Sequence, residues 1–338
     1  MALEAILRGG KYEIMHRIEA FFRASRPESV RTGFVLSTLT ERKIMRKALL
    51  AAAVAAAFAS PVAVNTAAAQ AKSPHTFTGN VAVVSDYRFR GISQTYNLPA
   101  LQGGFDYSHS SGLYFGNWNS SVSGNVFPNG SGVEMDFYGG WKTEFSNGIG
   151  LDIGAIYYFY PGARYNIFPA AGGVVKTGNE FNNTEIYIGA SYKWFSLKYY
   201  HATSDYFGIN SSALNGAFAG INSNGTGTGN TTGPAAGGNS RGTGYLDLNA
   251  NFEIFPKATL GLHVGQLRVK NYSGLNYTDY KISFAYDFGW ATLGLAYVAS
   301  NASSQYYRYA PPETFRAASG ETKDGSKDAV VFTISKTF

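Results

Sequence analysis

Histidine is the side chain that most often carries acid–base chemistry near neutral pH, so the histidines are the first candidates for a catalytic site. His201 comes closest to a Ser-His-Asp triad, because Ser204 and Asp205 follow it within four residues. Such close neighbours on an extended strand point to opposite faces and cannot form a proton relay without residues from elsewhere. The other histidines after residue 70 are His75, His109 and His263. None of them has a catalytic pattern around it, so no catalytic residue is predicted.

Metal and redox chemistry are equally poorly supported. The 338 residues include no Cys, which excludes disulfides, cysteine-ligated zinc and iron–sulfur clusters. The histidines and carboxylates also lack the spacing of a metal site. We therefore expect neither a metal nor a cofactor.

The charged residues after position 70 show a more informative pattern, because they recur at every second position between apolar ones. The polar positions of this alternation are Asn80, Asp86, Gln102, Asp106, Glu134, Asp136, Lys142, Asp152, Glu185, Lys198, Asp247, Glu253, Asp279, Lys281 and Asp287. Ten are acidic and three are basic. A period of two is that of a strand whose two faces meet different surroundings.

Twelve such strands of roughly 9–11 residues can be traced, the length of a tilted strand that crosses a membrane. They lie at about 77–87, 100–108, 113–122, 133–142, 151–160, 184–193, 195–203, 246–254, 258–267, 279–288, 290–299 and 328–338. Their connections alternate strictly between short and long. A soluble sandwich has no reason to sort its loops in this way, whereas an outer-membrane barrel has short periplasmic turns and long external loops. The sequence predicts an all-β, transmembrane, antiparallel up-and-down barrel.

Two further features fit that fold. Trp141, Trp194 and Trp290 fall at or beside the short turns, where an interfacial aromatic belt would lie. The final strand runs to Phe338, the last residue, although chain ends usually fray. We predict that this strand pairs with the first one and closes the barrel.

The chain before the barrel has the pattern of an export signal. Met45, Arg46 and Lys47 precede a twelve-residue apolar run that is too short to span a bilayer, and small residues near Ala69 follow it. We predict a signal peptide at 45–71 for the general secretory route and a barrel domain at 72–338. Residues 1–44 are interpreted as a mis-assigned start or an unstructured extension.

The basic isoelectric point, about 9.2, does not point to nucleic acid. Residues 1–69 contain 10 Lys and Arg against 5 Asp and Glu, and the remaining chain contains 18 against 17. The barrel region is therefore nearly neutral and has no basic surface of the kind that binds phosphate backbones.

Several stretches resemble a known family. Residues 79–95 and 99–114, together with 151–161, 192–199 and the closing Ile334–Phe338, look similar to the TorF family of proteobacterial outer-membrane porins. The likeness spans the chain after the signal peptide but does not cover 1–44 or the Gly-rich loop at 208–242. It implies a barrel and a pore in the Gram-negative outer membrane, and it supplies no functional residues.

The expected function is passive diffusion of small polar solutes through a water-filled barrel. The predicted pore-lining residues are Asp86, Asp106, Glu134, Asp136, Lys142, Asp152, Glu185, Lys198, Asp247, Glu253, Lys281 and Asp287. Because rings of carboxylates favour cations, a weak cation preference is one hypothesis; the alternative is interior pairs without selectivity. Arg88 and Arg90 are predicted at the entrance, where they steer anions, anchor lipopolysaccharide phosphates or pair with Asp86.

Two other functions stay open at this point. A closed or plugged barrel could act through its surface loops as an adhesin, a receptor or a structural protein, and an outer-membrane lipid hydrolase is a third alternative. The partners expected are outer-membrane lipids, lipopolysaccharide, the barrel-assembly machinery through the C-terminal strand, and small polar solutes. Self-association into a homo-oligomer is left open.

Overall fold

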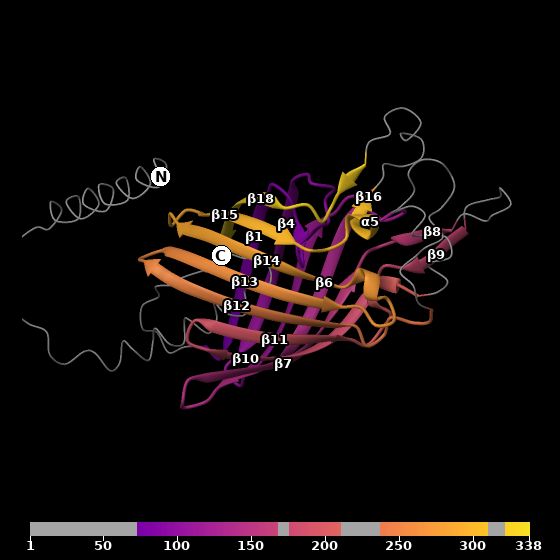
Figure 1. The fold of residues 1–338 in the computed structure, drawn as a ribbon. Helices are drawn as coiled ribbons and strands as arrows, with labels where there is room; N and C mark the ends of the chain where they lie inside the picture. Colours follow the sequence, from indigo (N-terminus) through magenta and orange to yellow (C-terminus); the bar gives the residue numbers. More distant parts are fainter. Residues whose placement is uncertain (1–72, 168–175, 211–236, 310–321) are drawn as a thin grey trace, which may run out of the picture. The chain divides into compact units, whose positions relative to one another are not determined.

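The protein is described by a computed structural model that covers residues 73–167, 176–210, 237–309 and 322–338. The predicted signal peptide, residues 1–44 and the centre of the Gly-rich loop lie outside these ranges. The described chain forms a closed, antiparallel barrel of twelve strands, as predicted (Figure 1).

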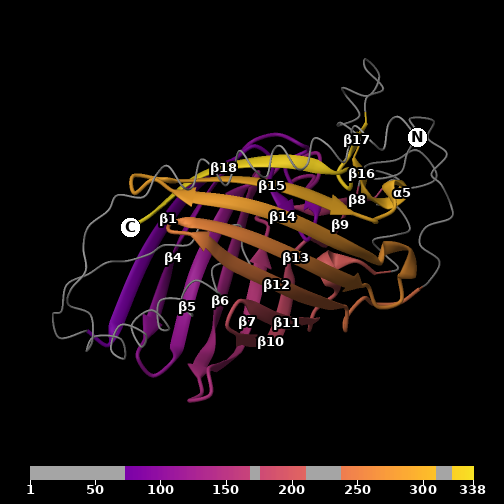
Figure 2. The same cartoon turned by 60° about the vertical axis from the view of Figure 1, so that its left-hand side comes forward.

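Each barrel strand pairs with its neighbours in the sequence, and β1 pairs with β18 to close the ring. Figure 2 shows the same ring turned by 60°. The barrel strands are β1 (His75–Val84), β4 (Ala100–His109), β5 (Leu113–Ser121), β6 (Val133–Glu144), β7 (Ile149–Phe159), β10 (Asn183–Tyr192), β11 (Phe195–Ala202), β12 (Gly244–Phe255), β13 (Ala258–Arg268), β14 (Tyr277–Asp287), β15 (Thr292–Ser300) and β18 (Ala329–Thr337).

The short turns lie at one end of the barrel and the long connections at the other. The long connections contain small hairpins and single helical turns (Figure 1). These are β2 (Arg88–Phe89), β3 (Ile92–Ser93), β8 (Arg164–Ile167), β9 (Lys176–Glu180), η1 (Tyr206–Gly208), η2 (Ser273–Leu275), α5 (Ser304–Tyr307), β16 (Arg308–Tyr309) and β17 (Lys323–Asp324).

The closure of the barrel uses the last residue of the chain. The backbone N–H of Phe338 donates to the carbonyl of Gly79 at 2.8 Å, and the N–H of Gly79 donates to the carbonyl of Phe338 at 3.2 Å. The chain end is thus held by the sheet, which explains why the alternation continues to the terminus.

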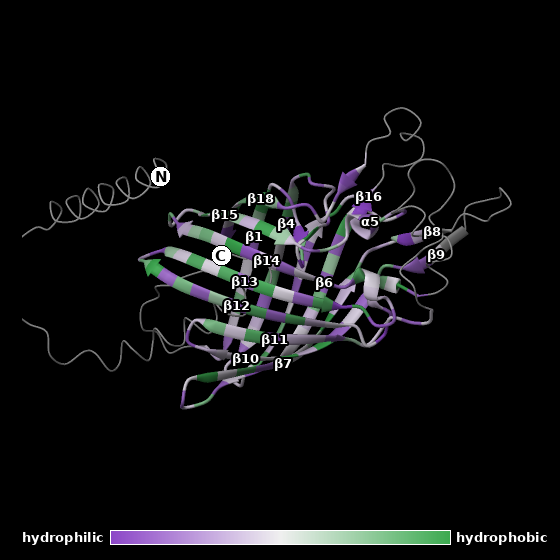
Figure 3. Ribbon diagram, in the orientation of Figure 1, coloured by the Kyte–Doolittle hydropathy of each residue, from purple (hydrophilic) through white to green (hydrophobic). Residues whose placement is uncertain are grey.

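The outer face of the barrel is apolar on every strand except β5, where Asn117 and Asn119 interrupt it. Outward side chains such as Phe77, Ile188, Ile282 and Phe332 are between 50% and 71% exposed, and the alternation of apolar and polar positions is visible along the strands in Figure 3. So large an apolar surface is stable only where lipid covers it. The barrel therefore spans a bilayer through its strands.

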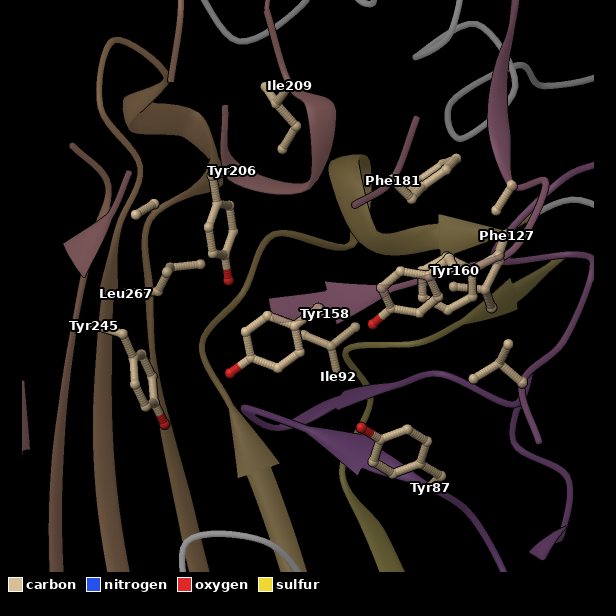
Figure 4. Packing of buried hydrophobic residues seen from close by; sticks show 14 of the residues in the cluster. Tyr87, Ile92, Phe127, Tyr158, Tyr160, Phe181, Tyr206, Ile209, Tyr245 and Leu267 are labelled. Carbon is tan, nitrogen blue, oxygen red and sulfur yellow. The ribbon is translucent and has the colours of Figure 1, made fainter. Parts of the chain in front are cut away.

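The interior near the long-loop end is filled by a cluster of aromatic side chains. It includes Tyr87, Tyr158, Tyr160, Tyr206 and Tyr245, which come from the first long connection, from β7 and its end, from η1 and from β12. Their rings occupy the space between the strands and the inward-folded connections (Figure 4). Trp118 is also buried here, whereas Trp141, Trp194 and Trp290 are exposed beside the short turns.

Candidate functional site in the barrel lumen

The connection between β1 and β4 folds into the barrel. Residues 88–99 follow the first predicted strand and are expected to form an external loop. Instead the chain turns inward after Val84, and Asp86, Tyr87 and Ile92 are all buried. The difference has a physical reason, because this connection carries charges whose partners stand on the barrel wall.

The tip of this connection is the turn between β2 and β3, at Arg90 and Gly91. Both residues have positive φ, 48° and 81°. A Cβ atom on Gly91 would lie 2.7 Å from the Cβ of Asp279 on β14, so the tip approaches the wall as closely as a glycine allows. We call residues 85–99 the inserted loop.

Arg90 reaches across the lumen. Its guanidinium donates to both carboxylate oxygens of Glu185, at 3.0 and 2.7 Å, and to the Tyr206 hydroxyl at 3.1 Å. It also lies 4.1 Å from the centroid of the Tyr245 ring. In the ring of strands, β11 and β12 stand opposite the β1–β4 pair from which the inserted loop emerges. The loop therefore divides the lumen.

The surroundings of Arg90 favour its charge. Burial lowers its pKa, but the Glu185 carboxylate outweighs this effect and the pKa is raised well above its ordinary value. Burial raises the pKa of Tyr206 to about 12, so the phenol stays neutral and accepts the hydrogen bond from Arg90. Figure 4 shows Tyr158, Tyr206 and Tyr245 with their hydroxyls directed toward a common space.

Arg88 fastens the base of the inserted loop. Its Nε donates to Asp86 at 2.5 Å, and its Nη1 donates to the backbone carbonyls of Gly325 and Lys327 at 2.9 and 2.7 Å. The Asp86 pairing is one of the roles considered from the sequence. Arg88 and Arg90 both lie inside the barrel, with side chains 6% and 5% exposed, rather than at an open entrance.

A chain of polar groups follows on β12, β13 and β14. His263 Nδ1 lies 3.1 Å from Asp247 Oδ1 and 3.0 Å from Asn249 Oδ1, and its Nε2 lies 2.8 Å from Asp279 Oδ1. One imidazole thus bridges two carboxylates. Lys281 is the register partner of His263 on the neighbouring strand. No partner of His263 is near it in the sequence, because all of its partners come from the neighbouring strands β12 and β14.

A second group of charges lies on β4 to β11. Lys198 Nζ donates to Asp152 at 2.7 Å, and the Tyr114 hydroxyl donates to the same carboxylate at 2.6 Å. Lys142 Nζ lies 5.3 Å from the centroid of the Tyr114 ring. The Tyr138 hydroxyl donates to Asp106 at 2.5 Å.

Glu134 and Asp136 on β6 are the most deeply buried carboxyl groups, with no exposed surface. The Tyr87 hydroxyl of the inserted loop donates to Glu134 at 3.1 Å. Glu253 and Asp287 differ from the other predicted residues: Glu253 is exposed, and Asp287 accepts the Gly289 N–H in a short turn. Glu253 and Asp287 pair with Thr259 and Thr292, which line the larger lumen cavity, so both stand on the inward parity at the short-turn end. The twelve predicted pore-lining residues therefore lie on the inward side of the strands or in the inserted loop.

The residues considered for a triad do not come together. Asp205 accepts hydrogen bonds from Asn210 and Ser240, Ser204 donates to Asn183, and His201 lies on the outward parity of β11. Within the described ranges no group of three or more His, Asp or Glu side chains is arranged to hold a metal ion. No helix among the described residues is long and apolar enough to cross a membrane.

The tyrosines of the site are not among the residues predicted from the sequence. Tyr158, Tyr200 and Tyr245 lie on the inward parity of their strands and contact the inserted loop or its partners. Their positions in the alternation could have indicated this role. A tyrosine on the inward side of a strand, when buried, needs a hydrogen-bond partner for its hydroxyl. What the sequence did not show is that a loop comes in to meet them.

Two cavities lie in the lumen beside the inserted loop. The larger has a volume of about 160 Å³, and Gln102, Asn251 and Thr333 are among its lining residues. The smaller has a volume of about 90 Å³ and lies around Arg90. Lys281 and Asn249 line both cavities, so they stand where the two meet.

Comparison with known proteins identifies a family but no function. A family model described as a bacterial protein of unknown function (Gcw_chp) matches residues 68–338. No match was found among curated proteins. The family comparison does not show the TorF label that the sequence suggested.

Solved structures with a similar course of chain include porins. The KdgM porin is 5% identical with a TM-score of 0.39, covering 77% of this chain and 98% of its own. The NanC porin is 8% identical with a TM-score of 0.39, covering 78% and 98%. OccD3 of Pseudomonas aeruginosa is 12% identical with a TM-score of 0.32, covering 82% and 62%. Likeness at this level carries no argument about function.

Proposed function

The chain belongs to the Gcw_chp family of bacterial proteins of unknown function, and we propose that it is an outer-membrane porin for small polar solutes. The observation that supports the proposal is the difference between the outer and the inner surface of the barrel. Its outside is largely apolar, and its inside holds charged side chains and two cavities. A membrane barrel with a polar, hollow interior is suited to passive diffusion.

The inserted loop makes this porin narrow. Arg90 bonds to Glu185 on the far wall, so a solute must pass between the loop and the small side chains of β15, β18 and β1. Ser335 and Thr333 on β18 and Gly294 on β15 are among the residues on that side of the larger cavity. The proposal places the barrel in the outer membrane of a Gram-negative cell, in contact with lipopolysaccharide and inserted by the barrel-assembly machinery.

Single-channel recording tests the proposal. The purified protein in a planar bilayer should give stable current steps of small conductance, because the inserted loop occupies part of the bore. Protein heated in denaturant before addition serves as the control and should give no steps. A correctly folded barrel that never conducts would contradict the porin proposal.

One observation favours a second candidate, a plugged barrel that acts through its surface loops. The aromatic cluster around Tyr158, Tyr160 and Tyr206 fills the lumen at the long-loop end. Substitution of Glu185 decides between the two: a porin with a tethered loop should conduct more when the tether is cut, and a solid plug should stay silent.

A further inference from the structure

Acidic residues outnumber basic ones among the predicted lumen residues, but this excess is not the charge that a solute in the lumen would meet. Asp86 pairs with Arg88 at 2.5 Å, Glu185 with Arg90 at 2.7 Å and Asp152 with Lys198 at 2.7 Å. Asp247 and Asp279 share His263. Counting carboxylates predicted a weak cation preference, but close ion pairs act as dipoles whose field falls off quickly.

None of the five remaining acidic residues lines either cavity; they are Asp106, Glu134, Asp136, Glu253 and Asp287. Glu134 and Asp136 have no exposed surface, and neither lines either cavity. Tyr87, which does line both cavities, donates a hydrogen bond to Glu134. The inserted loop therefore stands between these carboxyl groups and the open space.

Lys281 is placed differently from the other lumen cations. It faces the lumen between His263 on β13 and Val298 on β15 and lines both cavities. Among the described residues, its ammonium makes no direct hydrogen bond or ion pair, unlike Lys198, Arg88 and Arg90, although the Asp247 and Asp279 carboxylates act on it from a longer distance. Lys142 also makes no direct ion pair, but it lines neither cavity. An ammonium that is half-withdrawn from bulk water without a direct partner gains by meeting an anion.

The wall beside Lys281 carries further hydrogen-bonding groups. Ser283 follows it on β14, and Asn251 and Gly261 lie in the same row of the sheet. A Cβ atom on Gly261 would lie 2.6 Å from Ser283 Oγ and 3.0 Å from Asn251 Oδ1, so both side chains lean over the glycine. All three residues line the larger cavity.

The row of the sheet that holds Asn251, Gly261 and Ser283 continues into small apolar side chains. Ser283 pairs with Ala296 on β15, Ala296 pairs with Val331 on β18, and Val84 on β1 also lines the cavity. The cavity thus offers a cation and polar groups beside a stretch of small apolar side chains. A small organic anion with a carboxylate and a short carbon skeleton matches both parts of this wall.

We propose that Lys281, with Asn251 and Ser283, forms a binding subsite for small carboxylates in the larger cavity of the lumen. This inference rests on the proposed porin function, because it names the class of solute that the channel would select. The subsite itself depends only on the folded barrel. The charge of the ammonium binds the carboxylate, and the small apolar side chains pack against the carbon chain.

Calorimetric titration of the folded, detergent-solubilised protein with potassium propionate tests the subsite. Propionamide has the same skeleton without the charge and should bind much more weakly. Lys281→Met should weaken propionate binding about fivefold or more, the factor that one unit charge at 4 Å gives even in water. Lys257→Met, at an exposed short turn, should leave binding unchanged.

Single-channel recording separates this inference from the porin proposal. Propionate should reduce the potassium chloride current in the wild type and much less in Lys281→Met, while Lys257→Met, which lines neither cavity, should resemble the wild type. Propionate binding without channel steps would overturn the porin proposal and leave the subsite standing. No binding to the wild type, or equal binding by Lys281→Met, would overturn the subsite even if the protein conducts.

Discussion

At the scale of single residues, the contact between Arg90 and Glu185 decides the shape of the lumen. Both side chains are almost completely buried, at 5% and 1% exposure, and the two hydrogen bonds are bidentate. Removal of one partner from such a pair leaves an uncompensated buried charge, which typically costs about 3–5 kcal/mol. The inserted loop depends on this contact for its position.

We predict that Glu185→Gln releases the tip of the inserted loop. Because Arg90 would then be buried without a carboxylate, the loop should leave the wall, and the mean single-channel conductance should rise. Amide hydrogen exchange over residues 86–96 should also become faster, which can be measured without reference to conduction.

The matched control is Glu180→Gln. Glu180 makes an ion pair with Arg164 whose side chains are 48% and 42% exposed. Exposed pairs contribute about 0–1 kcal/mol, so this substitution should change neither conductance nor exchange of the loop. An equal response of both variants would show that the Arg90 contact does not hold the loop.

At the scale of elements, the inserted loop is the part that departs from a simple barrel. The hairpin of β2 and β3 is only two residues on each strand, and its tip needs positive φ at Arg90 and Gly91. The loop is held at its base by Arg88 and at its tip by Arg90, while Gly91 permits contact with β14. It acts as a constriction fastened at two points.

We predict that Gly91→Ala displaces the tip. The added Cβ would lie 2.7 Å from the Cβ of Asp279, and φ of 81° is unfavourable for alanine. The hairpin amides should exchange faster, and channel currents should become noisier in planar bilayers.

Gly289→Ala separates steric clash from backbone strain. Gly289 has a similar φ of 87°, but no atom lies within 4 Å of the added Cβ. This variant should show wild-type exchange in the inserted loop. If Gly91→Ala also behaves as the wild type, then the close approach to β14 does not position the tip.

At the scale of the whole molecule, the barrel is a cylinder with lipid outside and polar groups inside. The outward positions are apolar over the middle of every strand except β5, where Asn117 and Asn119 interrupt the pattern and hydrogen-bond to each other at 2.6 Å. The apolar band makes insertion into a bilayer favourable, and closure between β1 and β18 leaves the barrel sheet without an unpaired edge.

We predict that a charge in the middle of this band destabilises the inserted barrel. Ile188 is 52% exposed near the centre of β10, and Ile188→Arg should lower the free energy of unfolding in liposomes by about 2–4 kcal/mol. Urea titration measures this change. Gln266→Arg, near the long-loop end of β13, should cost at most about 1 kcal/mol, because the penalty falls toward the interface. Equal effects at the two positions would contradict a bilayer-spanning band.

Much of the fold could be predicted from the sequence because it depends on local patterns. Alternation along the last strand, for example, is set by lipid on one side and the lumen on the other, so Val330 and Phe332 face out and Val331 and Thr333 face in. The short and long connections follow from the same strand boundaries. Most of the predicted pore-lining residues face inward for this reason.

The arrangement of the site could not be predicted in the same way. Arg90 and Glu185 are 95 positions apart, and no pattern in the residues around either one predicts the other as its partner. Residues 85–99 are polar enough to lie in water, which is why they resembled an external loop. The two arginines lie inside the barrel because their carboxylate partners are there.

The sequence by itself determined the strands, the face of each side chain and the closure of the ring, since these follow from the period of two and from neighbour-to-neighbour pairing. Only the tertiary structure decided where the inserted loop goes, which carboxylates are paired and that Lys281 faces open space. Those outcomes depend on contacts across the lumen between strands that are distant in sequence, and such contacts exist only after the barrel has closed.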